Sequence, residues 1–165
     1  MIRRNRMFKD VQDILVSLLQ SKTTSAPWNR WDIIAGYPNE TVFDVFEKPI
    51  IFVADPSIEE KIYQQGASQK NYKLNVRIGS WVSIQNGGGE ELAIIISELL
   101  NLFDDPYICN RLTFDTQIGN TTYTAKTIKQ LGFSIIGIQL DRLISYPEDS
   151  QLRQDVNLIA MTNLS

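Results

Sequence analysis

One stretch constrains the fold of this chain most, because its hydrophobic period changes along its length: residues 70–103, KNYKLNVRIGSWVSIQNGGGEELAIIISELLNLF. Between Tyr72 and Ile84 the even-numbered residues are mostly apolar and the odd-numbered ones mostly polar. This period of two predicts a long strand with one buried and one solvated face. Between Leu92 and Phe103 apolar residues recur at spacings of three and four, which predicts an amphipathic helix. We therefore expect a long antiparallel-type strand followed by a helix that lies on its apolar face.

The residues before this stretch predict two helices and one buried strand. Apolar residues recur at helical spacing over residues 6–20, so an N-terminal helix is expected there. Residues 21–48 contain two prolines and several turn formers, and are expected to be irregular. Residues 49–54, PIIFVA, predict a central strand that is buried on both faces. Residues 57–65 begin with a match to the capping box, a serine followed three residues later by a glutamate, and predict a short helix.

The residues after this stretch predict mainly strands. Asp and Pro residues end the central helix, and residues 108–118 and 121–128 then predict a hairpin around a Gly-Asn connection. Residues 133–144 predict a strand whose apolar residues at even-numbered positions share one face, with a helix over its second half as the alternative. Residues 152–161 alternate between apolar and polar side chains and predict a final strand at an edge of the sheet.

This order of elements predicts the fold class. Runs of strands with helices set apart are typical of an α+β fold, in which the helices lie on one face of a mainly antiparallel sheet. A chain of 165 residues is long enough to bury a sizeable core as one domain. We therefore expect a single α+β domain over residues 1–165, with two main helices packed on one face of the sheet.

The composition argues against several classes of function. The net charge of −3 argues against a dedicated nucleic-acid binder, which is usually basic. The absence of histidine removes the commonest general base and the commonest metal ligand together. The single cysteine, Cys109, cannot form an internal disulfide and is expected to be a small buried residue in a reducing compartment. No run of about 18 uncharged apolar residues occurs, so no membrane-spanning segment is expected.

Two further patterns suggest chemistry but are better explained as structure. The sequence Asn86-Gly87-Gly88-Gly89-Glu90-Glu91 stands at the start of the central helix, where glycines can cradle a phosphate, but its acids oppose an anion and instead complement the helix dipole. The glycine run is expected to be a strand-to-helix connection.

The side chains of adjacent acids diverge on a helix or strand, so such acid pairs are expected to be caps and turns and not metal or acid-base sites. Such pairs are Glu59/Glu60, Glu90/Glu91, Asp104/Asp105 and Glu148/Asp149. We expect no cofactor, no metal and no enzymatic activity.

Aromatic and basic residues near the N-terminus are the first candidates for an interface. Trp28 and Trp31 lie in a polar loop, where tryptophan either covers an edge of the core or anchors a partner. Cover of the core is the favoured interpretation, because most tryptophans are largely buried. Arg3, Arg4 and Arg6 precede the first helix and are expected to be solvated, with contact to a partner or to an acidic neighbour as the alternative.

The polar faces of the long strand and of the last strand are the second candidate. Basic residues project from the polar face of the long strand, either into solvent or into a neighbouring subunit. Trp81 has the same parity but lies beyond Gly79, where a bulge can change the side on which it projects. An exposed edge strand at the C-terminus is also suited to cover by a neighbour. The candidate interface residues on these strands are Lys73, Arg77, Trp81, Arg153, Asp155 and Asn157.

The order of elements and three short strings resemble the tail terminator, or tail-completion, proteins of long-tailed bacteriophages. The strings are PIIFV at 49–53, YKLNVRIGSW at 72–81 and RQDVNLIA at 153–160. The resemblance implies a small α+β protein that forms a hexameric ring, caps the finished tail tube and presents it to the head. Residues 22–48 and 55–69 depart from the leanest version of this pattern, so the head-facing and tail-facing surfaces stay unassigned.

The expected function is therefore that of a structural virion protein in the tail or neck, made in the cytoplasm of the bacterial host. The resemblance implies that its partners are further copies of itself, the tail tube protein and a head-completion or neck protein. An acidic lumen would let DNA pass without specific binding. The first alternative is another neck ring component, such as a head-completion or stopper protein. The second is a small enzyme or ligand-binding module that uses carboxylates. Rings in solution favour assembly, whereas a strict monomer with a deep polar pocket favours the last alternative.

Overall fold

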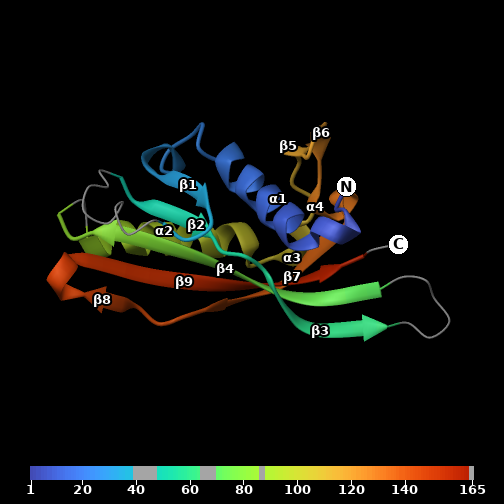
Figure 1. Ribbon diagram of the computed structural model, residues 1–165. Helices are drawn as coiled ribbons and strands as arrows, with labels where there is room; N and C mark the ends of the chain where they lie inside the picture. Colours follow the sequence, from blue (N-terminus) through green and yellow to red (C-terminus); the bar gives the residue numbers. More distant parts are fainter. Residues whose placement is uncertain (39–47, 64–69, 86–87, 164–165) are drawn as a thin grey trace.

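The computed structural model describes residues 1–38, 48–63, 70–85 and 88–163, and consists of a long twisted sheet, helices on one side of it and a small separate hairpin (Figure 1). The helices are η1 (Arg4–Arg6), α1 (Met7–Ser21), η2 (Trp28–Arg30), α2 (Gly88–Phe103), α3 (Pro106–Cys109), α4 (Ile128–Leu131) and η4 (Pro147–Asp149). The strands are β1 (Asp32–Ala35), β2 (Ile50–Val53), β3 (Ser57–Tyr63), β4 (Lys70–Ser83), β5 (Phe114–Ile118), β6 (Thr121–Lys126), β7 (Phe133–Leu140), β8 (Ile144–Tyr146) and β9 (Gln151–Thr162).

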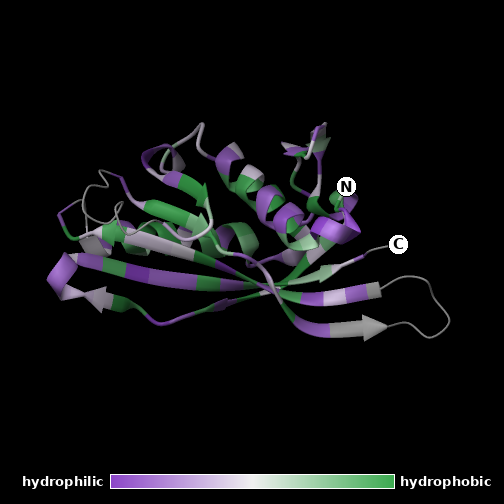
Figure 2. Ribbon diagram, in the orientation of Figure 1, coloured by the Kyte–Doolittle hydropathy of each residue, from purple (hydrophilic) through white to green (hydrophobic). Residues whose placement is uncertain are grey.

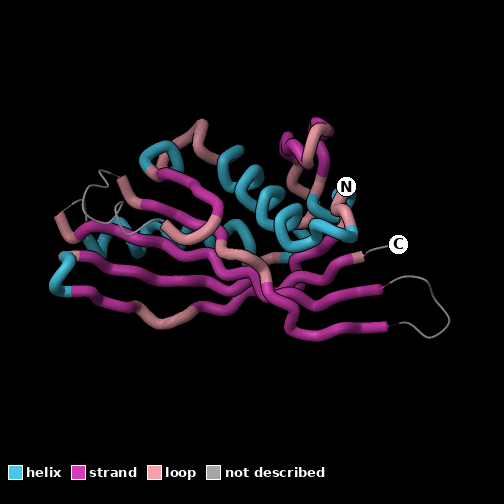
Figure 3. Tube along the Cα trace, viewed as in Figure 1, coloured by secondary structure: helices cyan, strands magenta, loops and turns pink. Residues whose placement is uncertain are grey.

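Seven strands form the main sheet, in the order β1-β2-β4-β9-β7, with β3 beside β4 and β8 beside β9. All neighbours are antiparallel except β1 and β2, which are parallel. The central pair β4 and β9 keeps an unbroken register from Lys73 opposite Met161 to Ser83 opposite Gln151. Strands β3 and β4 extend together beyond β1 and β2 (Figure 3). Strands β5 and β6 form the separate hairpin.

The main core lies between one face of the sheet and the helices α1 and α2. The even-numbered residues of β4 from Leu74 to Val82 are fully buried, as the period of two predicts, and α2 buries its apolar stripe against β4 and β9. Helix α1 alternates between hydrophobic and hydrophilic residues, and β2 is hydrophobic throughout (Figure 2). The buried residues that meet in this core include Ile14, Leu15, Leu18, Leu74, Val76, Ile78, Ile95, Leu99 and Phe103. The expected α+β fold, with two long helices on one face of a mainly antiparallel sheet, is confirmed.

The helix expected over residues 57–65 is wrong, because residues 57–63 form strand β3. Ser57 begins a strand that pairs antiparallel with β4, from Ser57 opposite Asn75 to Tyr63 opposite Lys70. A capping box stabilises a helix end by about 1 kcal/mol, whereas pairing with a long strand satisfies a row of backbone groups at once. The long-range pairing therefore overrides the local signal. Residues 64 and 65 lie outside the described residues.

Strand β9 is an inner strand of the sheet, so the expectation that the chain ends in an edge strand is wrong. Its two sides pair with β4 and with β7 and β8. The polar residues that suggested an edge point to the face of the sheet that the helices leave open. An alternation of polar and apolar side chains shows that one face of the sheet is uncovered. It does not show whether the backbone of the strand forms hydrogen bonds with a neighbouring strand on each of its two edges.

Three further segments differ from the expected elements. Residues 32–35 within the expected irregular segment form β1, and residues 106–109 form α3 ahead of a shorter β5. In β7 a register shift lies between Ile135 and Gly137, so Ile135 is buried and Ile136 is exposed. The bulge therefore changes the parity within the strand: Ile135 faces the core before it, and Ile138 packs against the core after it, as the even-numbered alternation predicts.

Candidate interaction surface on the helix-free face

The odd-numbered residues of β4 and β9 project from the face of the sheet opposite α1 and α2. Directly opposite residues of an antiparallel pair project to the same side. Arg77 faces Asn157, Gly79 faces Asp155 and Trp81 faces Arg153 across this pair. We call this surface the open face, and most of the predicted interface residues gather on it. Those residues are Lys73, Arg77, Trp81, Arg153, Asp155 and Asn157.

A buried ion pair lies at the centre of the open face. The Asp155 carboxylate accepts two hydrogen bonds from Arg153, from Nε at 2.9 Å and from Nη2 at 2.8 Å. Only 13% of the Arg153 side chain and 5% of the Asp155 side chain are exposed. The hydrogen bonds that Arg153 donates to Asp155 raise the pKa of Arg153 above its ordinary value, although burial opposes this. Paired hydrogen bonds of this kind are strong and hold the guanidinium in one orientation.

Aromatic rings surround the Arg153 guanidinium. Its Cζ lies 5.0 Å from the ring centre of Phe52, 5.4 Å from that of Trp81 and 5.7 Å from that of Tyr37. Trp81 also stacks on Tyr146, with ring centres 5.0 Å apart. Cations near ring faces gain an electrostatic attraction that adds to the burial of the rings. This aromatic cluster therefore holds Arg153 and Asp155 rigidly in the surface.

Gly79 lets the cluster lie flat on the sheet. A Cβ atom at this position would lie 2.1 Å from Cζ of Phe52 and 2.8 Å from Oδ1 of Asp155. The β4 register shows no shift at Gly79 with either neighbouring strand, so the bulge considered from the sequence is absent and Trp81 stays on the same face as Arg77. The absence of a side chain at Gly79 therefore lets the Phe52 ring and the Asp155 carboxylate pack directly against the β4 backbone.

Arg77 is the accessible charge of the open face. Its Nε lies 3.6 Å from Oδ2 of Asp155, and 45% of its side chain is exposed. A hollow of about 260 Å³ opens on one side, where Arg77 and Arg153 meet Asp141 and Arg142. A second hollow of about 460 Å³ opens on the other side, between Arg77, Asn157 and the start of β3. Two arginines thus share one buried carboxylate, and the outer arginine borders both hollows.

Two further polar residues of the open face, Asn157 and Lys73, are bound within the chain. Asn157 donates a hydrogen bond from Nδ2 to Oδ2 of Asp141, at 3.0 Å. Lys73 lies farther along β4, where its Nζ is 3.5 Å from Oε2 of Glu59. Exposed pairs of this kind contribute little to stability. They do orient the side chains that a partner would meet.

Trp28 and Trp31 lie away from the open face, in the main core. Their indole N–H groups donate to acids of α2, Trp28 to Glu98 at 3.0 Å and Trp31 to Glu91 at 2.7 Å. Arg30 donates two further hydrogen bonds to Glu91, at 3.1 and 3.2 Å. The interpretation of the tryptophans as cover of the core is confirmed. These contacts tie the loop before β1 to α2, at its first turn through Glu91 and in its second half through Glu98.

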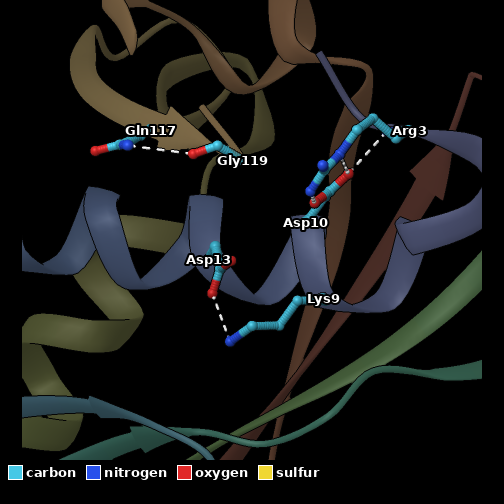
Figure 4. A network of polar contacts seen from close by, with 6 residues as sticks. All are labelled: Arg3, Lys9, Asp10, Asp13, Gln117 and Gly119. Carbon is cyan, nitrogen blue, oxygen red and sulfur yellow. Dashed lines mark hydrogen bonds and ion pairs between the residues drawn. The ribbon is translucent and has the colours of Figure 1, made fainter. Parts of the chain in front are cut away.

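The N-terminal arm is also bound within the chain (Figure 4). Arg3 donates to Asp10 from its backbone N–H at 2.8 Å and from Nη2 at 2.7 Å. Asp10 is fully buried, and burial acts to raise its pKa, but the hydrogen bonds from Arg3 outweigh this and lower it. The expectation that this end is solvated is therefore wrong for Arg3. Beside this pair, Lys9 contacts Asp13 at 3.0 Å, and Gln117 donates to the Gly119 carbonyl at 3.1 Å (Figure 4).

The sequence reasoning missed Phe52, Tyr37 and Tyr146 as parts of the open face. Phe52 lies in a strand with four consecutive buried residues, so no alternation marks the side on which it projects. Only its pairing with Gly79 places the ring on this face. Tyr37 and Tyr146 come from segments outside the two long strands, and no spacing links them to Trp81.

Cys109 is buried, as expected, and burial raises the pKa of its thiol to about 11, with the Asp105 charge adding to the effect.

Among the described residues, no group of three or more His, Cys, Asp or Glu side chains is placed to hold a metal ion. Within the same residues, no helix has both the length and the apolar character needed to cross a membrane.

Comparison with known proteins leaves the family of this chain open. No family model matches the chain, and no curated protein sequence matches it. Among the solved structures that match, one aligns with 100% of this chain and 98% of its own length, at 12% sequence identity and a TM-score of 0.49. That similarity is too remote to support a statement about function.

Proposed function

We propose that this protein is a structural subunit that assembles into a hexameric ring, and that the ring ends the tail tube of a long-tailed bacteriophage and joins it to the head. The observation that carries the proposal is the open face. In the part of the chain that the structure describes, the long helices α1 and α2 cover one side of the sheet and leave the other uncovered. The other side presents a rigid cluster of arginine and aromatic residues, with Arg77 half exposed between two hollows.

The chemistry of the open face suits a protein partner. Arginine and aromatic residues are enriched in the cores of protein interfaces. Arg153 is already held by Asp155 and the surrounding rings, so little side-chain freedom is lost when a partner covers it. A preorganised surface of this kind supports repeated, identical contacts between subunits.

The open edges of the sheet support assembly as well. Strands β7 and β8 lie at one side of the sheet, and large exposed apolar side chains follow them. These side chains are Ile136, Leu140, Leu143 and Ile144. Contiguous exposed apolar residues typically mark an interaction site, and unpaired strand edges are typically covered in the functional state. This edge takes the place of β9 as the candidate contact between subunits.

The resemblance to tail terminator proteins supplies the identity of the assembly. It implies a location in the virion, contact with the tail tube on one side and contact with a neck or head-completion protein on the other. The net charge of −3 is compatible with a lumen through which DNA slides, because affinity for DNA grows with each cation placed against a phosphate.

The proposal is tested by the size and shape of the purified protein, alone and after mixing with tail tubes. Light scattering coupled to size exclusion measures the mass, and negative-stain imaging shows the shape. We expect rings of about six subunits, free in solution or at the ends of tubes. A strict monomer at micromolar concentration that also leaves tube ends bare would contradict the proposal. Rings that bind heads but ignore tubes would identify another neck component instead.

A further inference from the structure

The two sides of the sheet present edges of different charge. Strand β3 lies on the side of β4 that also carries β2 and β1, whereas β7 and β8 lie on the far side of β9. Exposed acids, Glu59 and Glu60, mark the β3 edge. Glu59 contacts Lys73, but Glu60 takes part in none of the ion pairs found among the described residues. Among the described residues, the Glu60 carboxylate on the β3 edge therefore has no ion-pair partner.

The β7–β8 edge has a matching excess of positive charge. Arg142 lies in the connection between these strands and is exposed. With Arg77 and Arg153 it lines the hollow of about 260 Å³, where the only carboxylates in the lining are those of Asp141 and Asp155. Three cations and two anions leave one net positive charge. Both carboxylates are already engaged, Asp155 by Arg153 and Asp141 by Asn157.

Apolar side chains accompany both charges. Ile144 lines the positive hollow and is 38% exposed, and Ile58 is 38% exposed beside the acids of β3. Sites for nucleic acid are typically polar and much more basic than this one. The combination of an apolar rim with a single net charge favours a protein segment that carries a carboxylate.

We propose that the β3 edge of one subunit packs along the β7–β8 edge of the next, and that Glu60 of the first subunit pairs with Arg142 of the second at the arginine-lined hollow. This inference rests on the proposed ring and names the contact that builds it. The occupant of the β7–β8 edge is a second copy of this chain, because the chain itself carries the complementary charge on its opposite edge.

The geometry of the sheet is compatible with this contact. Glu60 lies opposite Lys73 in the β3–β4 pair, and opposite residues project to the same side, so Glu60 belongs to the open face. In a cyclic ring one rotation relates each subunit to the next and carries the open face to the same side of the ring, so the neighbour's Glu60 arrives on the side where the hollow opens. Two different edges meeting head to tail form a heterologous contact, which closes into a ring when the rotation between subunits allows it.

Charge reversal tests the pair. Arg142→Glu and Glu60→Arg each place like charges together, and each is expected to raise the concentration needed for ring assembly by about tenfold or more. The double variant Glu60→Arg with Arg142→Glu restores opposite charges and is expected to assemble as the unchanged protein does. Lys126→Glu and Asp104→Arg make the same charge changes on exposed side chains away from both edges, and are expected to leave assembly unchanged.

Mixing the two single variants provides a stronger form of the test. In a head-to-tail ring, alternating Arg142→Glu and Glu60→Arg subunits meet only through opposite charges, and an even-numbered ring closes. We expect each variant alone to assemble poorly and an equimolar mixture to form rings. Rings that form equally well from either variant alone would overturn the inference. Loss of binding to tubes by Arg142→Glu without loss of rings would overturn it too, because the hollow would then serve the tube.

Disulfide trapping separates this contact from ring formation itself. Cys109 is buried, so Glu60→Cys and Arg142→Cys introduce the only accessible thiols of the described residues. Under mild oxidation at high concentration, a mixture of these two variants is expected to form a heterodimer, whereas Lys126→Cys mixed with Glu60→Cys is not. Trapped dimers without rings would support the edge contact and contradict the proposed function. Rings without trapped dimers would support the function and contradict the contact.

Discussion

At the scale of single residues, Gly79 is the position that the open face depends on most directly. Gly79→Ala would place a Cβ atom against the Phe52 ring and the Asp155 carboxylate, so we expect the free energy of unfolding to fall by about 1–3 kcal/mol. Urea denaturation measures the change. Gly137→Ala is the matched control, because no atom lies within 4 Å of its added Cβ, and it is expected to be neutral. Equal losses for both variants would contradict the close approach at Gly79.

Asp10 makes the stability of the chain depend on pH in the acid range. Its pKa in the folded protein lies below the ordinary value of 3.8, so its stabilising contribution is complete above that value and is lost as the pH falls through the folded pKa. Asp10→Asn is expected to lower the urea midpoint at pH 7, and the difference from the unchanged protein should shrink as the pH falls through the lowered pKa of Asp10. A difference that stays constant with pH would show that the ion pair with Arg3 contributes nothing.

Cys109 is expected to be inert in the native protein. Because its pKa is raised to about 11, the thiol stays protonated at neutral pH, and its burial blocks access by reagents. A thiol-reactive dye is expected to label the chain in denaturant and to leave it unlabelled in native buffer over the same time. Rapid labelling of the native protein would mean that the segment around α3 opens readily.

At the scale of elements, two sequence matches to the capping box have opposite outcomes. Thr127 accepts a hydrogen bond from the Gln130 N–H at 3.1 Å and caps α4, whereas Ser57 begins a strand. Thr127→Ala is expected to lower the free energy of unfolding by about 1 kcal/mol. Ser57→Ala is expected to change it by less than about 0.5 kcal/mol. Thermal unfolding of the two variants measures the difference, and a comparable loss for Ser57→Ala would favour a helical cap there.

At the scale of the whole molecule, Arg77 tests whether the open face is an interface. Arg77→Gln removes the exposed charge while keeping much of the side chain, so the fold should survive because Arg153 still binds Asp155. We expect folded protein with weakened ring formation or weakened binding to tubes. Circular dichroism checks the fold, and light scattering checks the assembly. Lys126→Gln is the control for loss of an exposed charge. Intact assembly in the Arg77 variant would show that this part of β4 serves the core alone.

The sequence by itself determined the elements whose evidence is local. The period of two in residues 72–82 and the helical spacing in α1 and α2 place each apolar side chain on one face, and that pattern is complete within a few turns or residue pairs. The polar parity of β4 and β9 also identified the residues of the open face, because side-chain direction in a strand follows from position alone.

Only the tertiary structure decided which strands are neighbours. The inner position of β9, the conversion of residues 57–63 into a strand and the bulge in β7 all depend on hydrogen bonds to residues far along the chain. Such pairings leave no periodic trace in either partner, because both sides of a strand's backbone look alike in the sequence. For the same reason, only the fold brought Phe52 onto Gly79, and it placed Glu60 and Arg142 on opposite edges of the sheet.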